Sequence, residues 1–146
     1  MSDQIVSVSR VIAAPANQIF DVLADPARHA EIDGSDSVRK ARLTDPVRLR
    51  MGSRFGMDMH IGVPYRITNV VVEFEEGRLI AWRHFGRHRW RYELEPVQAG
   101  TRVTESFDWS TSPVGKILEL LHYPERHGPH METTLERLEA VVTSGS

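Results

Sequence analysis

The chain reads HRWRYELE over residues 88–95, and its side chains alternate between two chemical classes. Trp90, Tyr92 and Leu94 occupy one set of alternate positions, while arginines and glutamates occupy the other. Successive side chains of a strand point to opposite faces of a sheet, so this alternation predicts an antiparallel strand with one face in water. We therefore expect a sheet whose other face packs against the rest of the chain.

The same period of two extends in both directions from this stretch. We expect strands over residues 5–12, 37–43, 53–61, 65–74, 79–85, 88–95 and 101–109. Glycine and proline mark turns between them, as at Gly62 and Pro64. Residues 75–78 and 98–100 are expected to form two further turns, the first of them a four-residue hairpin turn.

Apolar residues at helical spacing flank the strands. Pro15 suits the first turn of a short helix, and a second short helix follows Pro26. After residue 113 the helical period returns, and we expect a long C-terminal helix, kinked or split over residues 124–129. This order of elements predicts one α+β domain over residues 1–146, with its helices on one face of an antiparallel sheet.

Composition excludes several classes of protein. The 146 residues are 40% hydrophobic and include no cysteine, which excludes disulfides, thiolate catalysis and iron–sulfur clusters. The net charge of −2 gives no overall attraction to nucleic acid or to an anionic membrane. The N-terminus lacks the pattern of a signal peptide, and no apolar run approaches the roughly 18 residues of a membrane span. We expect a cytoplasmic protein without stable membrane insertion.

Large, soft side chains crowd the predicted inner faces of the strands. These are Met57, Met59, Trp82, Trp90, Tyr92, Phe107 and Trp109. His84, His88 and Glu105 lie among them as sparse polar groups. Because strands twist, a long sheet curls, and one helix does not fill its concave side. A surface of apolar side chains with a few polar groups is typical of a small-molecule site. The same pattern also fits a solid core, and periodicity alone does not separate the two.

Several short stretches carry a resemblance to a known family. They are VIAAPA (11–16), IFDVLADP (19–26), GSRF (52–55), NVVVEF (69–74), LIAWR (79–83), YELEP (92–96), GTRVT (100–104) and METTLERL (131–138). Together they resemble the SRPBCC superfamily of START-like helix-grip proteins, and within it the bacterial polyketide cyclase/dehydrase-like group. The resemblance spans nearly the whole chain and is more specific for fold than for chemistry.

The resemblance implies a helix-grip fold. In this fold a curved antiparallel sheet of about six or seven strands wraps around the long C-terminal helix, and two short helices follow the first strand. It also implies a cavity between sheet and helix that takes sterols, polyketides, lipids or aromatic compounds. We therefore expect the chain to bind a hydrophobic small molecule of the lipid, polyketide or aromatic type, as a monomer or homodimer and without a cofactor.

The strand faces, and not a family template, give the candidate site residues. The ligand-binding candidates are Met57, Met59, Trp82, Trp90, Tyr92, Phe107, Trp109, Leu118, Leu121 and Met131. An enzyme of the polyketide cyclase/dehydratase type would also need an acid or base, for which Glu105 and His84 are the candidates. Burial would raise the pKa of Glu105, and histidine titrates near neutral pH. Whether the chain is an enzyme stays open.

Two further classes of site have weaker support. His122, His127 and His130 lie close in sequence, but prolines and a glycine interrupt their helix and no ligand set is complete, so no metal is expected. Arg83, Arg87, Arg89 and Arg91 with nearby tryptophans are a pattern found in single-strand nucleic-acid binders. Glu93 and Glu95 extend the outer face that carries Arg89 and Arg91, and cross-strand ion pairs on this wet face explain the arginines without nucleic acid. A nucleic-acid or protein-binding module is the second alternative to small-molecule binding.

Overall fold

The computed structural model describes residues 5–25, 28–32, 38–42, 48–61, 63–83, 89–108 and 127–143. Its elements are, in chain order, β1 (Ile5–Ile12), α1 (Ala16–Leu23), α2 (His29–Ile32), β2 (Val38–Arg42), β3 (Arg54–Ile61), β4 (Val63–Glu75), β5 (Leu79–Arg83), β6 (Arg89–Val97), β7 (Gly100–Asp108) and α4 (His127–Thr143). Within these ranges the strands form one seven-stranded antiparallel sheet, in the order β1-β7-β6-β5-β4-β3-β2. The predicted α+β class and the two short helices after the first strand are confirmed.

Neighbouring strands along the chain pair with one another from β2 to β7, and β1 completes the sheet by pairing with β7. Short turns make this possible: β4 and β5 are joined across Gly77, whose φ of +76° suits a residue without a side chain. A register shift between Val71 and Glu73 inserts an extra residue into β4. Such a bulge changes which residues share a face. As a result, Val71 and Phe74 both contribute to the face that carries the core.

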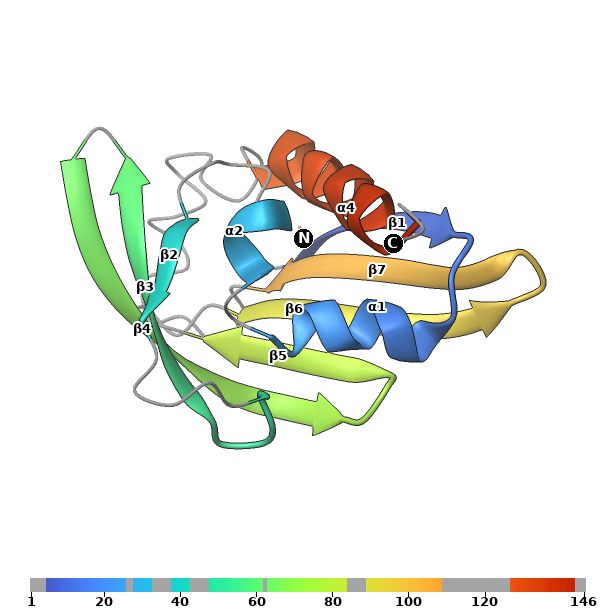
Figure 1. The fold of residues 1–146 in the computed structure, drawn as a ribbon, viewed down its shortest axis with the longest axis horizontal. Helices are drawn as coiled ribbons and strands as arrows, with labels where there is room; N and C mark the ends of the chain where they lie inside the picture. The colour runs from blue at the N-terminus through green and yellow to red at the C-terminus, as the bar shows by residue number, and fades with distance from the viewer. Residues whose placement is uncertain are drawn as a thin grey trace.

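The helices α1, α2 and α4 lie together on one face of the sheet (Figure 1). Helix α1 begins directly after Pro15 and buries Ile19, Phe20, Val22 and Leu23. These residues recur at helical spacing, so they form one apolar stripe that packs onto the sheet. Helix α4 contacts β1, β7 and both shorter helices.

Most predicted boundaries agree with the structure to within a few residues, and two prolines lie inside elements instead of between them. Pro64 was expected in a turn, but it is the second residue of β4 and pairs with His60. A proline fits there because it lies at the start of a strand. Helix α4 begins at His127, so Pro129 falls in its first turn, where a missing N–H removes no intrahelical hydrogen bond. Of the segment expected to be kinked, residues 124–126 lie outside the described residues and residues 127–129 form the start of α4.

Candidate functional site

Three strands bring the candidate side chains together on the face covered by the helices. The register places Trp82 of β5 opposite Trp90 of β6, and Trp90 opposite Phe107 of β7. In the next row, Tyr92 of β6 lies opposite Glu105 of β7. Directly opposite residues share a face with Cβ atoms about 5 Å apart. The alternation seen in the sequence therefore produces two adjacent rows of aromatic and acidic side chains.

Glu105 and Tyr92 form a buried hydrogen-bonded pair. The hydroxyl of Tyr92 donates to Oε2 of Glu105 at 2.9 Å, and the exposed fractions of the two side chains are only 5% and 3%. Burying a carboxyl group is costly unless it is hydrogen-bonded, and hydrogen bonds to charged groups contribute about 1.5–3 kcal/mol. This pair, which we call the Tyr92–Glu105 pair, is a polar point within an apolar face.

Aromatic rings from three further elements pack beside the pair. Trp82, 9% exposed, stacks on His29 of α2 with ring centroids 4.9 Å apart and meets Phe55 of β3 edge-on at 5.5 Å. The ring of Tyr92 lies 5.6 Å from that of Trp82. His29 is buried, and its Nε2 lies 2.8 Å from the carbonyl oxygen of Leu23. Contacts between aromatic rings therefore connect the Tyr92–Glu105 pair, through Trp82, to His29 of α2.

His29, Phe55 and Asn69 are buried residues of this region that the sequence-based list of site residues omits. The omission of His29 has a simple cause, because the candidates were drawn from the strands and the C-terminal helix, whereas His29 lies in the short helix α2. His29 and Ile32 are three residues apart and share a helix face. That spacing is the signal that points to His29. Phe55 of β3 was not selected either, and Asn69 of β4 lies directly opposite it.

Phe107 and Met131 form a second buried contact, between β7 and α4. Trp90 packs against them and is half-buried, and its ring centroid lies 4.7 Å from that of Phe107. Phe107 and Met131 expose 0% and 1% of their surface, so a guest would touch them only after displacing what covers them. Trp90 retains accessible surface and is better placed to meet a ligand directly.

The structure does not describe the side chains of six predicted site residues. His84, Trp109, Leu118 and Leu121 lie outside the described residues. Met57 and Met59 lie in β3, opposite Ile67 and Tyr65, but their side chains are outside the description. Their roles remain predictions.

The buried cluster that holds Trp82 and Tyr92 continues beneath α4 and α1 as a solid core. Leu135 and Leu138 of α4 pack with Ile12, Phe20 and Leu94, and none of these side chains exposes more than 2% of its surface. Side chains without accessible surface leave no room for a guest between them. Among the predicted site residues whose side chains are described, Trp90 keeps the most accessible surface.

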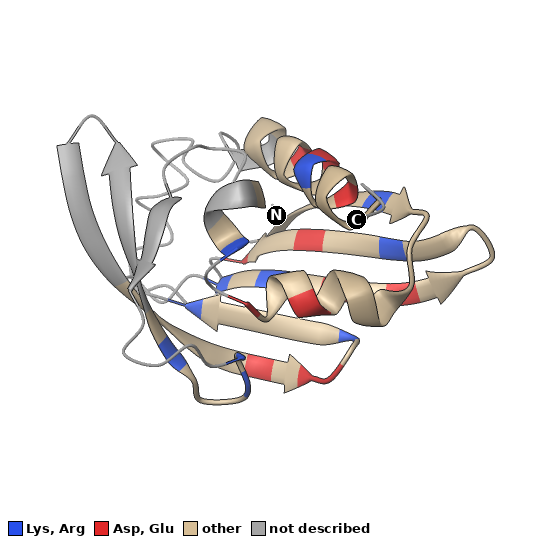
Figure 2. Ribbon diagram, viewed as in Figure 1, with Lys and Arg blue, Asp and Glu red and all other residues tan. Residues whose placement is uncertain are grey.

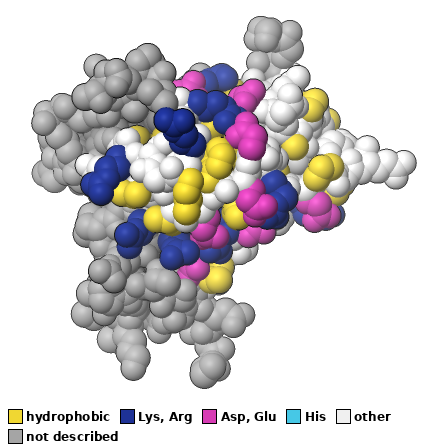
Figure 3. All heavy atoms as spheres, turned by 90° about the horizontal axis from the view of Figure 1, so that it is seen from below, with side chains coloured by type: hydrophobic (Ala, Val, Ile, Leu, Met, Phe, Trp, Pro, Cys, Tyr) yellow, Lys and Arg dark blue, Asp and Glu magenta, His cyan; other side chains and the backbone are white. Residues whose placement is uncertain are grey.

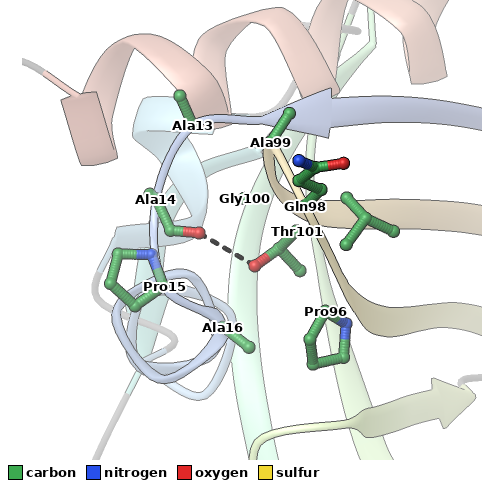
Figure 4. A pocket seen from close by; sticks show the side chains of 10 residues that line it. Ala13, Ala14, Pro15, Ala16, Pro96, Gln98, Ala99, Gly100 and Thr101 are labelled. Carbon is green, nitrogen blue, oxygen red and sulfur yellow. Dashed lines mark hydrogen bonds between the residues drawn. The ribbon is translucent and has the colours of Figure 1, made fainter.

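A shallow depression lies elsewhere, at the corner where β1 leads into α1 (Figure 4). It is lined by residues 13–16 and 96–101, has a volume of about 480 Å³ and opens widely to solvent. The hydroxyl of Thr101 donates to the carbonyl oxygen of Ala14 there, at 2.8 Å. This depression is on the outside of the β6–β7 turn and is not the cavity that the sequence predicted.

The arginines of β6 form ion pairs across the sheet. Arg89 and Arg91 both donate to Glu73 of β4, at 3.1 and 2.7 Å, and Arg91 lies 3.5 Å from Asp108. The expected cross-strand ion pairs are thus present, and their acidic partner is Glu73. The bulge in β4 places Glu73 opposite Ala81, and this small side chain leaves room for Arg91 to reach across β5.

Acidic and basic side chains are mixed on the described part of the surface. Figure 2 shows both signs on the sheet and on α4, and Figure 3 shows them intermingled on the face seen from below. Engagement of Arg89 and Arg91 by Glu73 favours the ion-pair explanation of the arginine cluster over nucleic-acid binding.

We expect the Glu73→Gln substitution to lower stability at neutral pH by about 1 kcal/mol, between the values typical of exposed and buried ion pairs. Burial alone would raise the pKa of Glu73, but hydrogen bonds and charge from Arg91 and Arg89 outweigh it and hold this pKa below its usual range. The stabilisation is therefore present above about pH 4.3, the usual glutamate pKa, and is lost as the pH falls through the lower folded-state value.

Urea denaturation of both proteins at pH 7, 5 and 3 measures this difference. Glu95→Gln is the matched control, because Glu95 pairs with Arg102 at 3.4 Å in an exposed position. The control should change stability by less than about 0.5 kcal/mol at every pH. A Glu73→Gln difference that persists unchanged at pH 3 would contradict the ion-pair explanation.

Metal and membrane sites find no support within the described ranges. No group of three or more histidine, aspartate or glutamate side chains there is arranged to hold a metal ion. His84, His88 and His122 lie outside those ranges. Among the described helices, none has the length and apolar character needed to cross a bilayer.

Two solved structures share this architecture. Protein NE0264 from Nitrosomonas europaea superposes with a TM-score of 0.73 at 18% identity, over 99% of this chain and 97% of its own. The AHSA1-like protein from Aeromonas hydrophila gives 0.71 at 17% identity, over 96% of this chain and 92% of its own. At these identities the likeness shows the fold alone, and it confirms the predicted helix-grip architecture.

Sequence comparison gives the family. An uncharacterized protein of Mycobacterium tuberculosis, Rv0088, is 39% identical over 96% of this chain. The match covers 65% of that relative, so the chain spans less than two thirds of its length. The family described as "Polyketide cyclase / dehydrase and lipid transport" matches residues 3–143, which confirms the resemblance found in the sequence. The chain therefore belongs to the polyketide cyclase/dehydrase and lipid transport family.

Proposed function

We propose that this chain binds a hydrophobic small molecule, of the lipid, polyketide or aromatic type, between its sheet and its C-terminal helix. The observation that carries the proposal is the buried Tyr92–Glu105 pair beside Trp82 and Trp90. Small-molecule sites are mostly apolar and contain a few polar groups that fix the orientation of the ligand. Family membership supports the same function.

The site is proposed around Trp90, the one predicted site residue with a described side chain that is not fully buried. Trp90 is half-buried there, so a guest that covers its ring removes apolar surface from water. Complete burial of one large apolar side chain is worth about 1.5–3 kcal/mol. Several such contacts are enough to bind a hydrophobic ligand without a covalent bond.

An enzyme of the cyclase/dehydratase type is the second candidate, and the Tyr92–Glu105 pair is the observation that favours it. A carboxyl group held by a hydroxyl inside an apolar site can accept or donate a proton at a bound substrate. His84, the other acid/base candidate, lies outside the described residues. A carrier would bind its ligand without converting it. An enzyme would lose turnover but keep substrate binding in the Glu105→Gln variant.

Native mass spectrometry of freshly purified protein, together with binding of the neutral apolar dye N-phenyl-1-naphthylamine, tests the proposal. We expect a bound small molecule of defined mass, and dye binding that the Trp90→Ala substitution weakens about tenfold, the factor that corresponds to 1.4 kcal/mol. Trp90 is a suitable target because it is only partly buried, so its removal should lower the stability of the fold less than the loss of a fully buried ring.

Phe74→Ala is the matched control. Phe74 is also a partly buried ring, but it packs on Phe20 of α1 at 5.6 Å and lies two strands away from Tyr92 across the sheet. This control should change dye affinity less than about twofold, well below the effect of losing a ligand contact. Equal effects of the two substitutions, or protein that binds neither dye nor any copurified molecule, would refute the proposed site.

A further inference from the structure

A row of residues crosses the outer face of the sheet, the face turned away from the helices. Each member lies directly opposite the next, on neighbouring strands from β3 to β7. Phe55, Trp82 and Phe107 are chain neighbours of members of this row and are buried on the covered face, so the row itself points outward. The members are Arg54, Val70, Arg83, Arg89 and Asp108.

Arg83 and Arg89 place two like charges side by side within this row. They lie directly opposite each other on β5 and β6, where the Cβ atoms of paired residues are about 5 Å apart and like charges are destabilising. Figure 2 shows basic residues at the adjoining ends of these two strands. A negative group held between the two guanidinium groups would remove the repulsion.

The acids nearby balance only part of this positive charge. Glu73 accepts hydrogen bonds from Nη1 of Arg89 and from Arg91. Asp108 lies 3.5 Å from Arg91. The other two arginines of the row form no ion pair with any side chain that the structure describes. Four arginines therefore face two carboxylates, which leaves two positive charges at this end of the outer face.

The guanidinium groups are also within reach of solvent. The side chain of Arg89 is 30% exposed, and Glu73 engages only one of its terminal nitrogens. Arg83 is half-buried and Arg54 is exposed. Guanidinium groups present N–H donors in a planar fork that matches the oxygens of a phosphate group. A phosphomonoester carries a charge of about −1.5 to −2 at neutral pH, so one such group balances both unpaired arginines.

We propose that Arg54, Arg83 and Arg89 form a second binding site, the outer-face arginine site, which binds the phosphate group of a phosphomonoester. The phosphate lies between Arg83 and Arg89 and accepts hydrogen bonds from both. This site does not depend on the proposed hydrophobic site, because the two lie on opposite faces of the sheet. The phosphate can belong to a soluble small molecule or to a lipid headgroup, and the experiment below distinguishes the two.

Titration calorimetry with glycerol 3-phosphate at pH 7 tests the site. This compound has no apolar part, so it does not report on the hydrophobic site. We expect saturable binding that Arg83→Gln weakens at least about tenfold, the effect of losing one charged hydrogen-bond partner. Binding should also weaken as salt is added, because the arginines are at the surface.

Arg102→Gln is the matched control. It removes the same charge from the same face of the sheet, but Arg102 pairs with Glu95 and lies six residues along β7 from Asp108. That separation is about 20 Å, beyond the screening length of about 10 Å at a salt concentration of about 0.1 M. At this salt concentration the control should therefore change affinity less than about twofold.

Two further measurements separate binding from folding. Arg83→Gln removes a like-charge contact, so it should not lower Tm, and its loss of binding then reports on the site. Glu73→Gln frees Arg89 from its acid and should strengthen binding of glycerol 3-phosphate, whereas Glu95→Gln should leave it unchanged. Weaker binding in Glu73→Gln would contradict the assignment to Arg89.

Vesicles identify the source of the phosphate. Flotation with phosphatidylcholine vesicles that contain phosphatidic acid, lost in Arg83→Gln and absent with phosphatidylcholine alone, assigns the site to a lipid headgroup. Binding of glycerol 3-phosphate without flotation assigns it to a soluble phosphomonoester. The proposal is overturned if neither probe binds, or if Arg83→Gln and Arg102→Gln weaken binding equally. Binding of oligothymidylate that depends on Arg83, with no binding of either probe, would overturn it in favour of nucleic acid.

Discussion

Replacing Gly100 with alanine is expected to lower the free energy of unfolding by at least about 3 kcal/mol. Gly100 begins β7 with a φ of +138°, a conformation that residues with a side chain rarely adopt. A Cβ atom there would lie 2.1 Å from the carbonyl oxygen of Ile12 and 2.9 Å from Cα of Ala13. Both are backbone atoms, so no change of rotamer relieves the overlap. The end of β1 would have to move.

That movement would disturb the connection between β1 and α1. Next to Gly100, Thr101 donates to the carbonyl oxygen of Ala14 at 2.8 Å, and the amide of Ala14 donates to Ile12 at the same distance. These bonds direct the chain from the edge strand into α1. Since α1 buries Ile19 and Phe20 in the core, a shift at this corner would loosen the packing of the helix as well.

Gly77→Ala is the matched control for this prediction. Gly77 also has a positive φ, +76°, but a Cβ atom there would meet no other atom within 4 Å. The Gly77→Ala substitution should lower the free energy of unfolding by the backbone strain alone, about 1–2 kcal/mol. Thermal unfolding of the two variants should therefore differ, with Gly100→Ala lowering Tm by on the order of 10 °C and Gly77→Ala by clearly less. Equal losses would show that the close approach at Ile12 does not determine the stability of the corner.

The strands were predictable because one physical rule governs them. Successive side chains face opposite sides, so the run from Arg89 to Glu95 reveals both its conformation and its buried face from spacing alone. The same rule places Glu105 with Phe107 on the covered face of β7, and the burial of both agrees with it. Pairing of neighbouring strands then brings Tyr92 opposite Glu105.

Features that depend on contacts between distant segments were not predictable in this way. The partner of Arg89 and Arg91 is Glu73, which reaches them because of a bulge in β4 and a small residue, Ala81, in the strand between. No local pattern shows where an extra residue enters a strand pair. The packing of α4 on the sheet is a similar case. The spacing of its apolar residues shows which face of the helix is apolar, but it does not show how closely Leu135 and Leu138 approach the sheet.

Replacing Trp82 with alanine is expected to cost about 3–5 kcal/mol, the range observed when a large aromatic residue is removed from a core. Trp82 joins three elements: its ring stacks on His29 of α2, meets Phe55 of β3 and lies against Tyr92 of β6. Helix α2 has only four residues, and so short a helix is held by packing more than by its own hydrogen bonds. Loss of the indole therefore removes the main surface on which His29 rests and leaves a cavity beside the Tyr92–Glu105 pair.

Comparison with Trp90→Ala distinguishes packing from ligand contact. Trp90 keeps accessible surface, so its removal should cost less stability than removal of Trp82, about 1–2 kcal/mol, while weakening binding of the apolar dye. Trp82→Phe retains an aromatic ring in contact with His29 and should recover part of the stability lost in Trp82→Ala. Urea denaturation followed by circular dichroism measures all three variants without relying on tryptophan fluorescence. If Trp82→Ala costs no more than Trp90→Ala, the rings of Trp82, His29 and Phe55 do not form the packed wall that positions the Tyr92–Glu105 pair, and the proposed site loses its rigid support.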